Sequence, residues 1–451
     1  MDFTQATLVF VVLAPGVVFG VLALLWLLGW VPPERVISRI TGWMFSASII
    51  ALLPVLRSLA ASGAPAVTVT FGNWFAVHDY RFPMVLMADR LSLPFLGMTV
   101  VLSGLIGRFS VTYLHREPGF FRFFLLLHLF AFGSLLAFAA GSFDLLVGGW
   151  ELVGITSVLL IAFFQQRTAP VENALRVFGV YRACDIGLLA AVFAMHNWAG
   201  TASFAGGLPR LTGYRATTVC ILLLLAAAGK AAQVPFSGWL PRAMEGPTPS
   251  SAIFYGAISI HAGAYLLLRV QPMLVQSGLA SALVISVGVA TAVYGTISGR
   301  VSADAKSSLA FASLTQVGVV FVEIGMGWKW VAVVHILGHA TVRTLQFLRA
   351  PSMLHDYHQM HSAIGGETSE AGGYLEELFP ERMQLWLYRW ALDRGHLDTI
   401  LDRFVIHPLM RLSGFFSGLD RMGLHRPRRE RGEVVVPVSS AAPRGARQEG
   451  I

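Results

Sequence analysis

Cysteine and lysine are both scarce in this chain of 451 residues. Its two cysteines, Cys184 and Cys220, lie in apolar segments and predict neither a disulfide framework nor a cysteine-based zinc site. Only three of its 33 basic side chains are lysines (Lys230, Lys306 and Lys329), and the rest are arginines. Arginine is therefore the ordinary cation of this chain, and a lysine placed in an apolar segment needs a specific reason.

Charge is scarce as well. Charged residues make up 13% of the chain and hydrophobic residues 55%, whereas about a quarter of a soluble domain is charged. The mean hydropathy is +0.64, and apolar stretches of membrane-spanning length recur along the chain. We therefore predict an all-α, polytopic membrane helix bundle. The first apolar stretch has no basic start and no small-residue cleavage site, so we expect a retained span and not a signal peptide.

We predict about eleven transmembrane helices. Their expected ranges are 7–30, 41–61, 91–114, 122–141, 143–165, 174–198, 216–236, 247–270, 278–299, 307–326 and 329–349. The seventh is expected to be a broken helix near 216–245, because Pro235 follows Lys230 in the middle of the apolar run. Residues 66–90 alternate polar and apolar side chains, which predicts a short hairpin outside the membrane.

The basic residues of the loops predict an orientation in the membrane. Loops after the odd-numbered spans carry more arginine than the other loops, so the positive-inside rule places the N-terminus outside and the C-terminal tail in the cytoplasm. We expect this multi-pass chain to reside in a bacterial inner membrane.

The composition changes after about residue 350. Residues 380–424 carry apolar side chains at helical spacing, which predicts an amphipathic helical tail that lies on the membrane surface or on a partner. His355, His358 and His361 have no firm ligand spacing, so a solvated loop is favoured there over a metal site. We divide the chain into N-terminal spans with the hairpin (1–84), a main domain of spans (85–350), a linker and amphipathic region (351–424) and a disordered basic tail (425–451).

Lys230 lies within an apolar run long enough to cross a membrane. A charge at membrane depth costs about 3 kcal/mol or more, and such residues usually mark ion or proton paths. A buried lysine can release its proton, whereas an arginine cannot. Glu151, inside another apolar span, is the expected partner, and its neutralisation would let Lys230 give up a proton. The alternative is a structural ion pair that holds two helices together.

Further ionisable residues lie in the apolar spans. His335, His339 and Arg343 are spaced to line one helix face. A polar stripe along a water-filled path is favoured there over a metal site, because no third ligand is evident. Glu323 either belongs to this path or only marks the end of its span. Arg182, Asp185 and His261 complete the set.

Several segments resemble a known family. Trp150-Glu151-Leu-Val-Gly154 and Gly229-Lys230-Ala-Ala-Gln-Val-Pro235-Phe are similar to motifs of the proton-translocating, antiporter-like subunits of respiratory complex I and of multisubunit sodium/proton antiporters. The resemblance extends over about residues 85–350 and also includes the segments 87–93, 239–252, 304–318 and 335–343.

This resemblance implies a role for each ionisable residue. Glu151 and Lys230 would form the proton-transfer pair, and His261, His335 and His339 would continue the proton path. The implied supporting ion network consists of Arg182, Asp185, Asp304, Lys306 and Arg343. The sequence has no Cys/His/Asp cluster of zinc type, so we expect no metal and no cofactor in this chain. The resemblance implies a transporter subunit instead of an enzyme.

The chain also departs from the family pattern. Tyr255 stands where the family usually has a histidine, Arg343 replaces a lysine, and a broken twelfth span is not found. A short antiporter-like chain with a basic tail resembles the membrane subunit of the two-part DAB-type system for accumulating dissolved inorganic carbon. That resemblance implies a hetero-oligomer with a large soluble, zinc-binding, carbonic-anhydrase-like subunit, in which a proton or Na⁺ gradient drives CO2 hydration and bicarbonate accumulation.

Two other functions remain open. The chain could be a proton-pumping or antiport subunit of a complex I-like or multisubunit Na⁺/H⁺ antiporter complex. It could also be a membrane anchor for a soluble enzyme, in which case the buried charges would have no role in transport.

Overall fold

The computed structural model describes residues 1–61, 63, 65–77, 80–302, 304–364, 380–397, 399, 403, 407–408, 411 and 414–416. Of residues 351–364 it describes the backbone alone. Residues 1–398 form one compact unit and residues 399–451 form a second. The predicted domain boundaries stay predictions.

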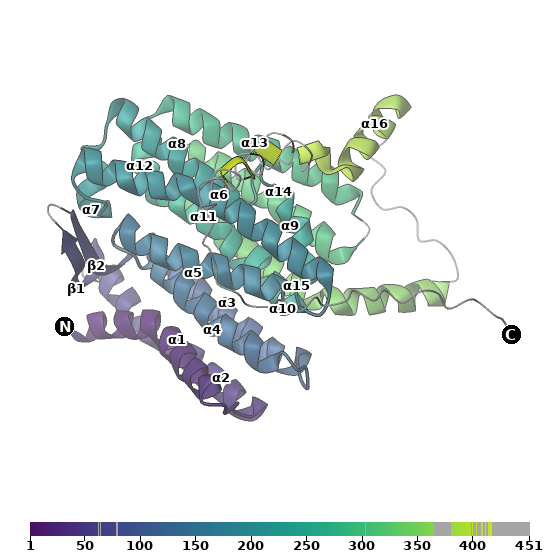
Figure 1. Ribbon diagram of the computed structural model, residues 1–451, viewed down its shortest axis with the longest axis horizontal. Coiled ribbons are helices and arrows are strands. Elements are labelled where there is room, and N and C mark those ends of the chain that lie inside the picture. Colours follow the sequence, from purple (N-terminus) through teal and green to yellow (C-terminus); the bar gives the residue numbers. More distant parts are fainter. Residues whose placement is uncertain are drawn as a thin grey trace, which may run out of the picture. The chain divides into compact units, whose positions relative to one another are not determined.

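Eleven helices in the described part of the chain are long and apolar enough to span a membrane, which confirms the predicted helical membrane fold. They are α1 (Phe3–Leu27), α2 (Glu34–Ala61), α3 (Ser92–Tyr113), α4 (Phe120–Phe138), α5 (Phe143–Ile161), α6 (Thr168–Ala199), α8 (Gly213–Lys230), the compound span Thr248–Arg269, α13 (Gly278–Arg300), α14 (Ala305–Gly325) and α15 (Lys329–Ile364). Figure 1 shows them packed side by side, with the first helices in purple and the last in green.

Apolar composition and small residues account for this packing. The compound span Thr248–Arg269 is buried by other helices, and it contacts α3, α4, α5, α8, α14 and α15. α4 packs on α5 at Gly133 and Gly149, where a Cβ atom on either residue would overlap the facing helix. Small residues of this kind allow close packing of helices in a membrane.

Two spans in the middle of the chain are interrupted. α8 ends at Lys230, and after residues 231–238 the chain resumes helical turns as α9 (Trp239–Arg242) and η2 (Ala243–Glu245), which confirms the predicted break. The next span also departs from a regular helix. It consists of α10 (Thr248–Ser251), a π-helical turn η3 (Ala252–Ala257) and α11 (Ser259–Arg269), whereas the sequence predicts one continuous helix over 247–270. π-Helical turns inside helices are frequent at functional sites.

The predicted hairpin is present. β1 (Ala66–Val77) pairs antiparallel with β2 (Tyr80–Asp89), with Ala66 opposite Asp89. Main-chain hydrogen bonds join β2 to the segment after α4, since Met87 donates to the Ala139 carbonyl oxygen at 2.7 Å. The hairpin is thereby fixed to the ends of the spans.

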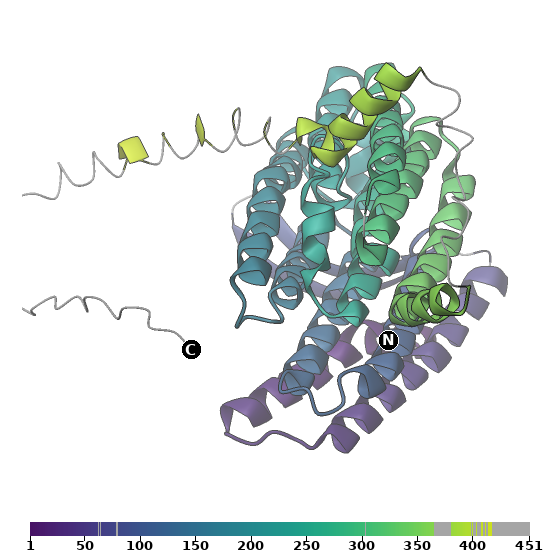
Figure 2. The same ribbon diagram turned by 90° about the vertical axis from the view of Figure 1, so that its right-hand side faces the viewer.

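The region after residue 350 differs from its prediction. The prediction of a loop around residues 355–361 was wrong, because α15 continues as a helix to Ile364. The side chains of His355, His358 and His361 lie outside the described residues. α16 (Glu381–Leu392) confirms that the amphipathic segment begins as a helix, and it packs against α13 (Figure 2).

Only part of the apolar face predicted for the tail packs against the helix bundle. The Trp390 ring contacts the Tyr294 ring of α13 at a centroid distance of 6.0 Å, and Leu397 also packs against the core. Leu385 and Trp386 are exposed instead. From the spacing of apolar residues in the sequence we also expect Leu401, Phe404 and Val405 on this face, and these three lie outside the described residues.

Candidate ion-transfer site

Lys230 is buried at the last position of α8, where the helix stops. Its Nζ donates a hydrogen bond to the main-chain carbonyl oxygen of Trp150 in α5 at 3.2 Å. The ammonium also lies 4.7 Å from the ring centroid of Trp150 and 4.4 Å from that of Tyr181, within the range of cation–π attraction. Two aromatic faces and one carbonyl thus take the place of water around this charge.

Gly154 makes room for the ammonium. It lies one turn after Trp150 on α5, and a Cβ atom at this position would be 3.0 Å from the Lys230 Nζ. A side chain here would crowd the lysine Nζ, whereas Arg182, at 3.6 Å from the same position, would be in ordinary contact. The glycine therefore belongs to the lysine site.

A cluster of three charged residues lies beside the lysine. Arg182 in α6 forms ion pairs with Glu151 of α5 and, at 2.7 Å, with Asp185 one turn along its own helix. Asp185 also accepts a hydrogen bond of 2.6 Å from the Trp150 indole. Trp150 therefore contacts Asp185 through its indole N–H, and Lys230 through both its ring and its main-chain carbonyl.

The predicted proton-transfer pair comes from two helices, Glu151 from α5 and Lys230 from α8, and their direct partners differ. Glu151 pairs with Arg182, and Lys230 bonds to the carbonyl of Trp150. Arg182 and Asp185 lie where a supporting network is expected. Arg182 holds the Glu151 carboxylate, so a change at Arg182 would alter the charge near Lys230.

The three predicted histidines lie close together on two helices. His261 of α11 and His339 of α15 share a hydrogen bond of 3.0 Å between Nε2 and Nδ1, and the His261 Nδ1 meets the Ala257 carbonyl oxygen at 2.5 Å. The rings of His335 and His339 are 6.4 Å apart. His335 contacts Glu323 at 2.9 Å and Gln316 at 3.0 Å, both on α14.

Glu323 therefore contacts this group, and it also lies near the end of its span, two residues before the end of α14. The order of contacts is Glu323, His335, His339 and His261. The His261 Nδ1 bonds to Ala257, the last residue of the π-helical turn η3. This irregular turn thus helps to position the histidine.

Tyr255 lies in the same turn, between the two groups. Its ring centroid is 5.8 Å from that of Trp239, which is 5.1 Å from that of Tyr181 beside Lys230. The Tyr255 hydroxyl and the Gln233 Oε1 are buried without a hydrogen-bond partner among the described residues. Buried polar atoms normally have such a partner, and ordered water can supply one. These residues connect the lysine region to the span that carries His261.

Arg343 lies near the histidines but faces a cavity. Its guanidinium bonds to Gln346 of the same helix at 2.8 Å. Arg343, Arg300 and Gln316 are among the residues that line a cavity of about 310 Å³ between α13, α14 and α15. Because Gln316 also contacts His335, the cavity adjoins the histidine group.

The structure does not place Asp304 and Lys306 in contact with the Arg182 cluster. The Asp304 carboxylate accepts a hydrogen bond from the Ser307 amide at 2.8 Å and caps the N-terminus of α14. The Lys306 Nζ donates to the Gly246 carbonyl oxygen at 3.3 Å. Both residues stabilise the ends of helical segments.

Sequence reasoning missed two buried polar clusters. Asp89 of β2 pairs with Arg269 of α11 at 2.5 Å, and Arg269 also donates to the Tyr265 hydroxyl at 2.6 Å. In the second cluster, Asp144 at the start of α5 contacts His196 at 2.8 Å and Tyr80 at 3.1 Å. Burial and the neighbouring charge of Asp144 raise the pKa of Tyr80 to about 12.

Asp89 and Arg269 join the hairpin to the centre of the bundle. Burial opposes the ionisation of Asp89, but the charge of Arg269 and its hydrogen bond hold the pKa of Asp89 below its usual value. A carboxyl group with a lowered pKa stabilises the fold at neutral pH, and this stabilisation is lost as the pH falls through the lowered pKa.

We expect Arg269→Leu to lower the free energy of unfolding by about 3–5 kcal/mol, because it leaves the Asp89 carboxylate without its partner. Thermal unfolding of the detergent-purified chain would measure this loss. The matched control is Glu245→Gln, which removes the exposed ion pair with Arg167 and should cost about 0–1 kcal/mol. Equal losses in the two variants would contradict a stabilising role of the buried pair.

Comparison with known proteins agrees with this architecture. The family model described as "NADH:quinone oxidoreductase/Mrp antiporter, TM" matches residues 140–367, and that of the "NADH-Ubiquinone oxidoreductase (complex I), chain 5 N-terminus" matches residues 74–124. The first match contains all the residues of the lysine cluster and the histidine group.

Individual relatives give the same result. The chain is 34% identical to NADH-ubiquinone oxidoreductase chain 5 of Schizophyllum commune and to NADH-quinone oxidoreductase subunit L of Mycobacterium tuberculosis. Both alignments cover 64% of this chain, and they cover 43% and 46% of those proteins, respectively. The chain thus spans about half the length of the curated relatives it matches.

A solved structure of the Mrp complex from Dietzia sp. DQ12-45-1b is similar as well. It superposes with a TM-score of 0.65 at 26% identity, over 75% of this chain and 37% of that one. On the family match and the eleven membrane-length helices, this chain belongs to the family of NADH:quinone oxidoreductase and Mrp antiporter transmembrane subunits.

Proposed function

We propose that this chain is a proton-conducting, antiporter-like subunit of a larger membrane complex of the complex I or Mrp type. The observation that carries the proposal is the arrangement of its buried ionisable groups. Lys230 lies beside the Glu151–Arg182–Asp185 cluster, and the histidine group meets the next interrupted span. Ionisable groups at membrane depth usually serve an ion or proton path.

The chemistry of these groups favours protons over Na⁺. Imidazole rings take up and release protons near neutral pH, and His261 and His339 contact each other directly. A hard cation such as Na⁺ prefers several oxygen ligands, which the contacts of these rings do not provide. Arg300 and Arg343 line the cavity beside His335 and would repel a metal cation there.

In the proposed path, Lys230 exchanges a proton with the water and polar groups around Tyr255, and the histidines carry it onward. Movement of the Glu151 carboxylate relative to Arg182 would change the charge that Lys230 experiences. Lys230 would then bind or release its proton. Arg343 cannot release a proton and would act only through its charge.

The family comparisons favour this proposal over the inorganic-carbon function predicted from the sequence. The relatives described above are named as complex I and Mrp proteins. The finer assignment, to a two-part system with a soluble zinc-binding, carbonic-anhydrase-like partner, stays a prediction. The two proposals differ in the partner that they require. The inner-membrane location and the orientation stay predictions, and a test of conduction does not address them.

Purification from native membranes would test both the kind of partner and the conduction of protons. We expect membrane-embedded partner subunits to copurify with the chain, and the complex in liposomes to move protons along an imposed pH gradient, as measured with a pH-sensitive dye. A Na⁺ gradient without a pH gradient is the control and should give no uptake of labelled Na⁺. A soluble zinc protein as the main partner, found by metal analysis, would favour the carbon-uptake function. Absence of proton movement in the intact complex would refute conduction.

A further inference from the structure

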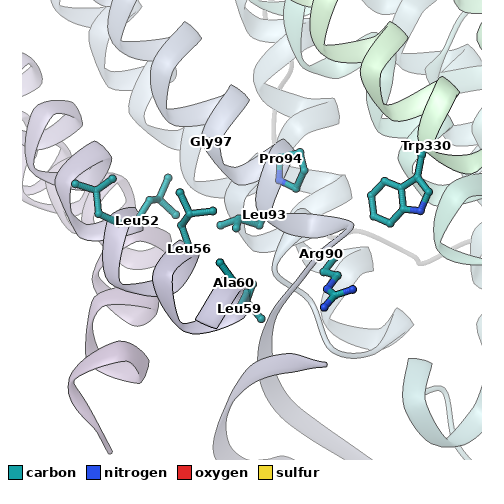
Figure 3. Close-up of a pocket in the computed structure, with 10 residues that line it drawn as sticks. Leu52, Leu56, Leu59, Ala60, Arg90, Leu93, Pro94, Gly97 and Trp330 are labelled. Atoms are coloured by element: carbon teal, nitrogen blue, oxygen red, sulfur yellow. The ribbon is translucent and has the colours of Figure 1, made fainter. Parts of the chain in front are cut away.

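An apolar groove opens on the surface of the bundle between α2 and α3. It has a volume of about 580 Å³, and its apolar lining comes from Leu52, Leu53, Leu56, Leu59, Ala60, Leu93, Pro94 and Gly97. Figure 3 shows the α2 leucines on one side of Leu93 and Pro94, and Arg90 and Trp330 toward the other side. Leu53 and Leu56 are exposed, so this face presents uncovered hydrocarbon at membrane depth.

The groove has a polar end. Arg90 and Trp330 line the groove and also line a second cavity of about 390 Å³, together with Asp89 and Lys329. The two cavities therefore adjoin each other at Arg90 and Trp330. Trp330 is 53% exposed, at the start of α15, and tryptophan favours the boundary between hydrocarbon and lipid head groups.

Two cations at this end, Arg90 and Lys329, share the cavity with Asp89. Asp89 is engaged by Arg269, and among the described residues no ion pair is formed by Arg90 or Lys329. Lys329 contacts the Trp330 ring at 5.7 Å. An apolar groove that leads to Arg90 and Lys329 is complementary to a molecule with a long hydrocarbon chain and a negatively charged head.

We infer that this groove is a binding site for a phospholipid with a net negative head group. One acyl chain lies along the leucines of α2, and the phosphate lies between Arg90 and Lys329. Arginine and lysine side chains at a membrane surface attract anionic head groups by their charge. Trp330 lies where the apolar groove meets the polar cavity, and the glycerol backbone of the lipid passes there.

Gly97 provides a direct test of the apolar part. A Cβ atom at Gly97 would meet no other atom within 4 Å, so Gly97→Leu places a larger side chain in the groove from a position with open space. Gly42 on α2 also has open space around it and lies outside the groove, which makes Gly42→Leu the matched control. Arg90→Gln with Lys329→Gln removes the charges, and Arg108→Gln, an exposed arginine near the other end of α3, is their control.

Native mass spectrometry of the detergent-purified full chain would measure the binding of phosphatidylglycerol and of phosphatidylcholine. We expect phosphatidylglycerol to bind roughly tenfold more tightly, and both Gly97→Leu and the double glutamine variant to lose this preference. The two control variants should keep it. Quenching of tryptophan fluorescence by brominated phosphatidylglycerol should also fall in Trp330→Phe.

Several results would overturn the inference. Equal binding of the two lipids would show an ordinary lipid-facing surface. Competition by soluble glycerol phosphate at the same concentration would show a site for free phosphate instead of a lipid. Loss of a membrane partner from the Gly97→Leu variant, with lipid binding unchanged, would show that a protein helix occupies the groove. This lipid site does not depend on proton conduction, so either proposal can fail without the other.

Discussion

Replacement of Lys230 by arginine is expected to abolish proton conduction nearly as completely as replacement by alanine. Arginine retains the positive charge but cannot release its proton under physiological conditions. Its guanidinium is also broader than the ammonium that fits between the rings of Trp150 and Tyr181. Proton flux into liposomes, normalised to the amount of reconstituted complex, should fall at least about a hundredfold in both variants, because the proton-carrying group is removed.

Lys306→Arg is the matched control for this result. Lys306 donates to a carbonyl oxygen at 3.3 Å, as Lys230 does at 3.2 Å, but it lies near the start of α14 and away from the cluster. Arginine can make the same kind of contact there, so flux should stay near the wild-type value. Normal flux in Lys230→Arg at equal protein amount would show that only a cation is required, as expected for a structural ion pair or a membrane anchor.

Glu151→Gln should separate the charge of the carboxylate from its volume. Glutamine is nearly the same size, but it cannot balance Arg182. We therefore expect this variant to assemble into the complex but to conduct protons poorly. The same liposome assay as for the Lys230 variants would measure this. An unaltered flux would show that Arg182 and Asp185 control the lysine without Glu151.

The second large effect is expected at the central histidines. His261→Asn and His339→Asn retain a polar side chain but remove the group that binds and releases a proton. Since His261 and His339 contact each other at 3.0 Å, each variant interrupts the same path. We expect the same liposome assay to show at least a roughly tenfold loss of proton flux, which is the smaller end of what one proton-transfer group contributes.

His128→Asn is the control for burial. His128 is also fully buried and contacts Thr41 at 3.1 Å, but it lies among the first helices and outside the proposed path. The His128→Asn variant should conduct protons normally, even if its melting temperature falls. The triple alanine variant of His355, His358 and His361 should also conduct. Equal losses in His128→Asn and His339→Asn would mean that buried histidines matter here for folding and not for transfer.

The membrane architecture was predictable because it depends on composition. Long apolar runs specify the spans directly, and the position of Pro235 after Lys230 indicates the break in the seventh. The π-helical turn at Ala252–Ala257 was not predictable in this way. It lies in a fully buried span, where contacts with the surrounding helices decide the local backbone geometry and the apolar pattern carries no signal.

The membership of the site was easier to predict than its contacts. Ionisable residues in apolar spans stand out in the sequence, and the spacing of Arg182 and Asp185 on one helix already indicates their ion pair. The contact of Lys230 with a main-chain carbonyl has no such signature, because every residue has this group. Asp89 and Arg269 are 180 positions apart, so only the folded chain brings them together.

The main-chain contact of Lys230 also determines which substitutions in this region would have an effect in a mutational screen. Any amino acid at position 150 still offers the same carbonyl oxygen, so substitutions of Trp150 would report only on the contacts of its indole with Asp185 and with the Lys230 ammonium. Position 154 behaves in the opposite way, since every side chain larger than hydrogen would crowd the ammonium. A residue with no functional group of its own would therefore score in a saturation screen as if it were chemically essential.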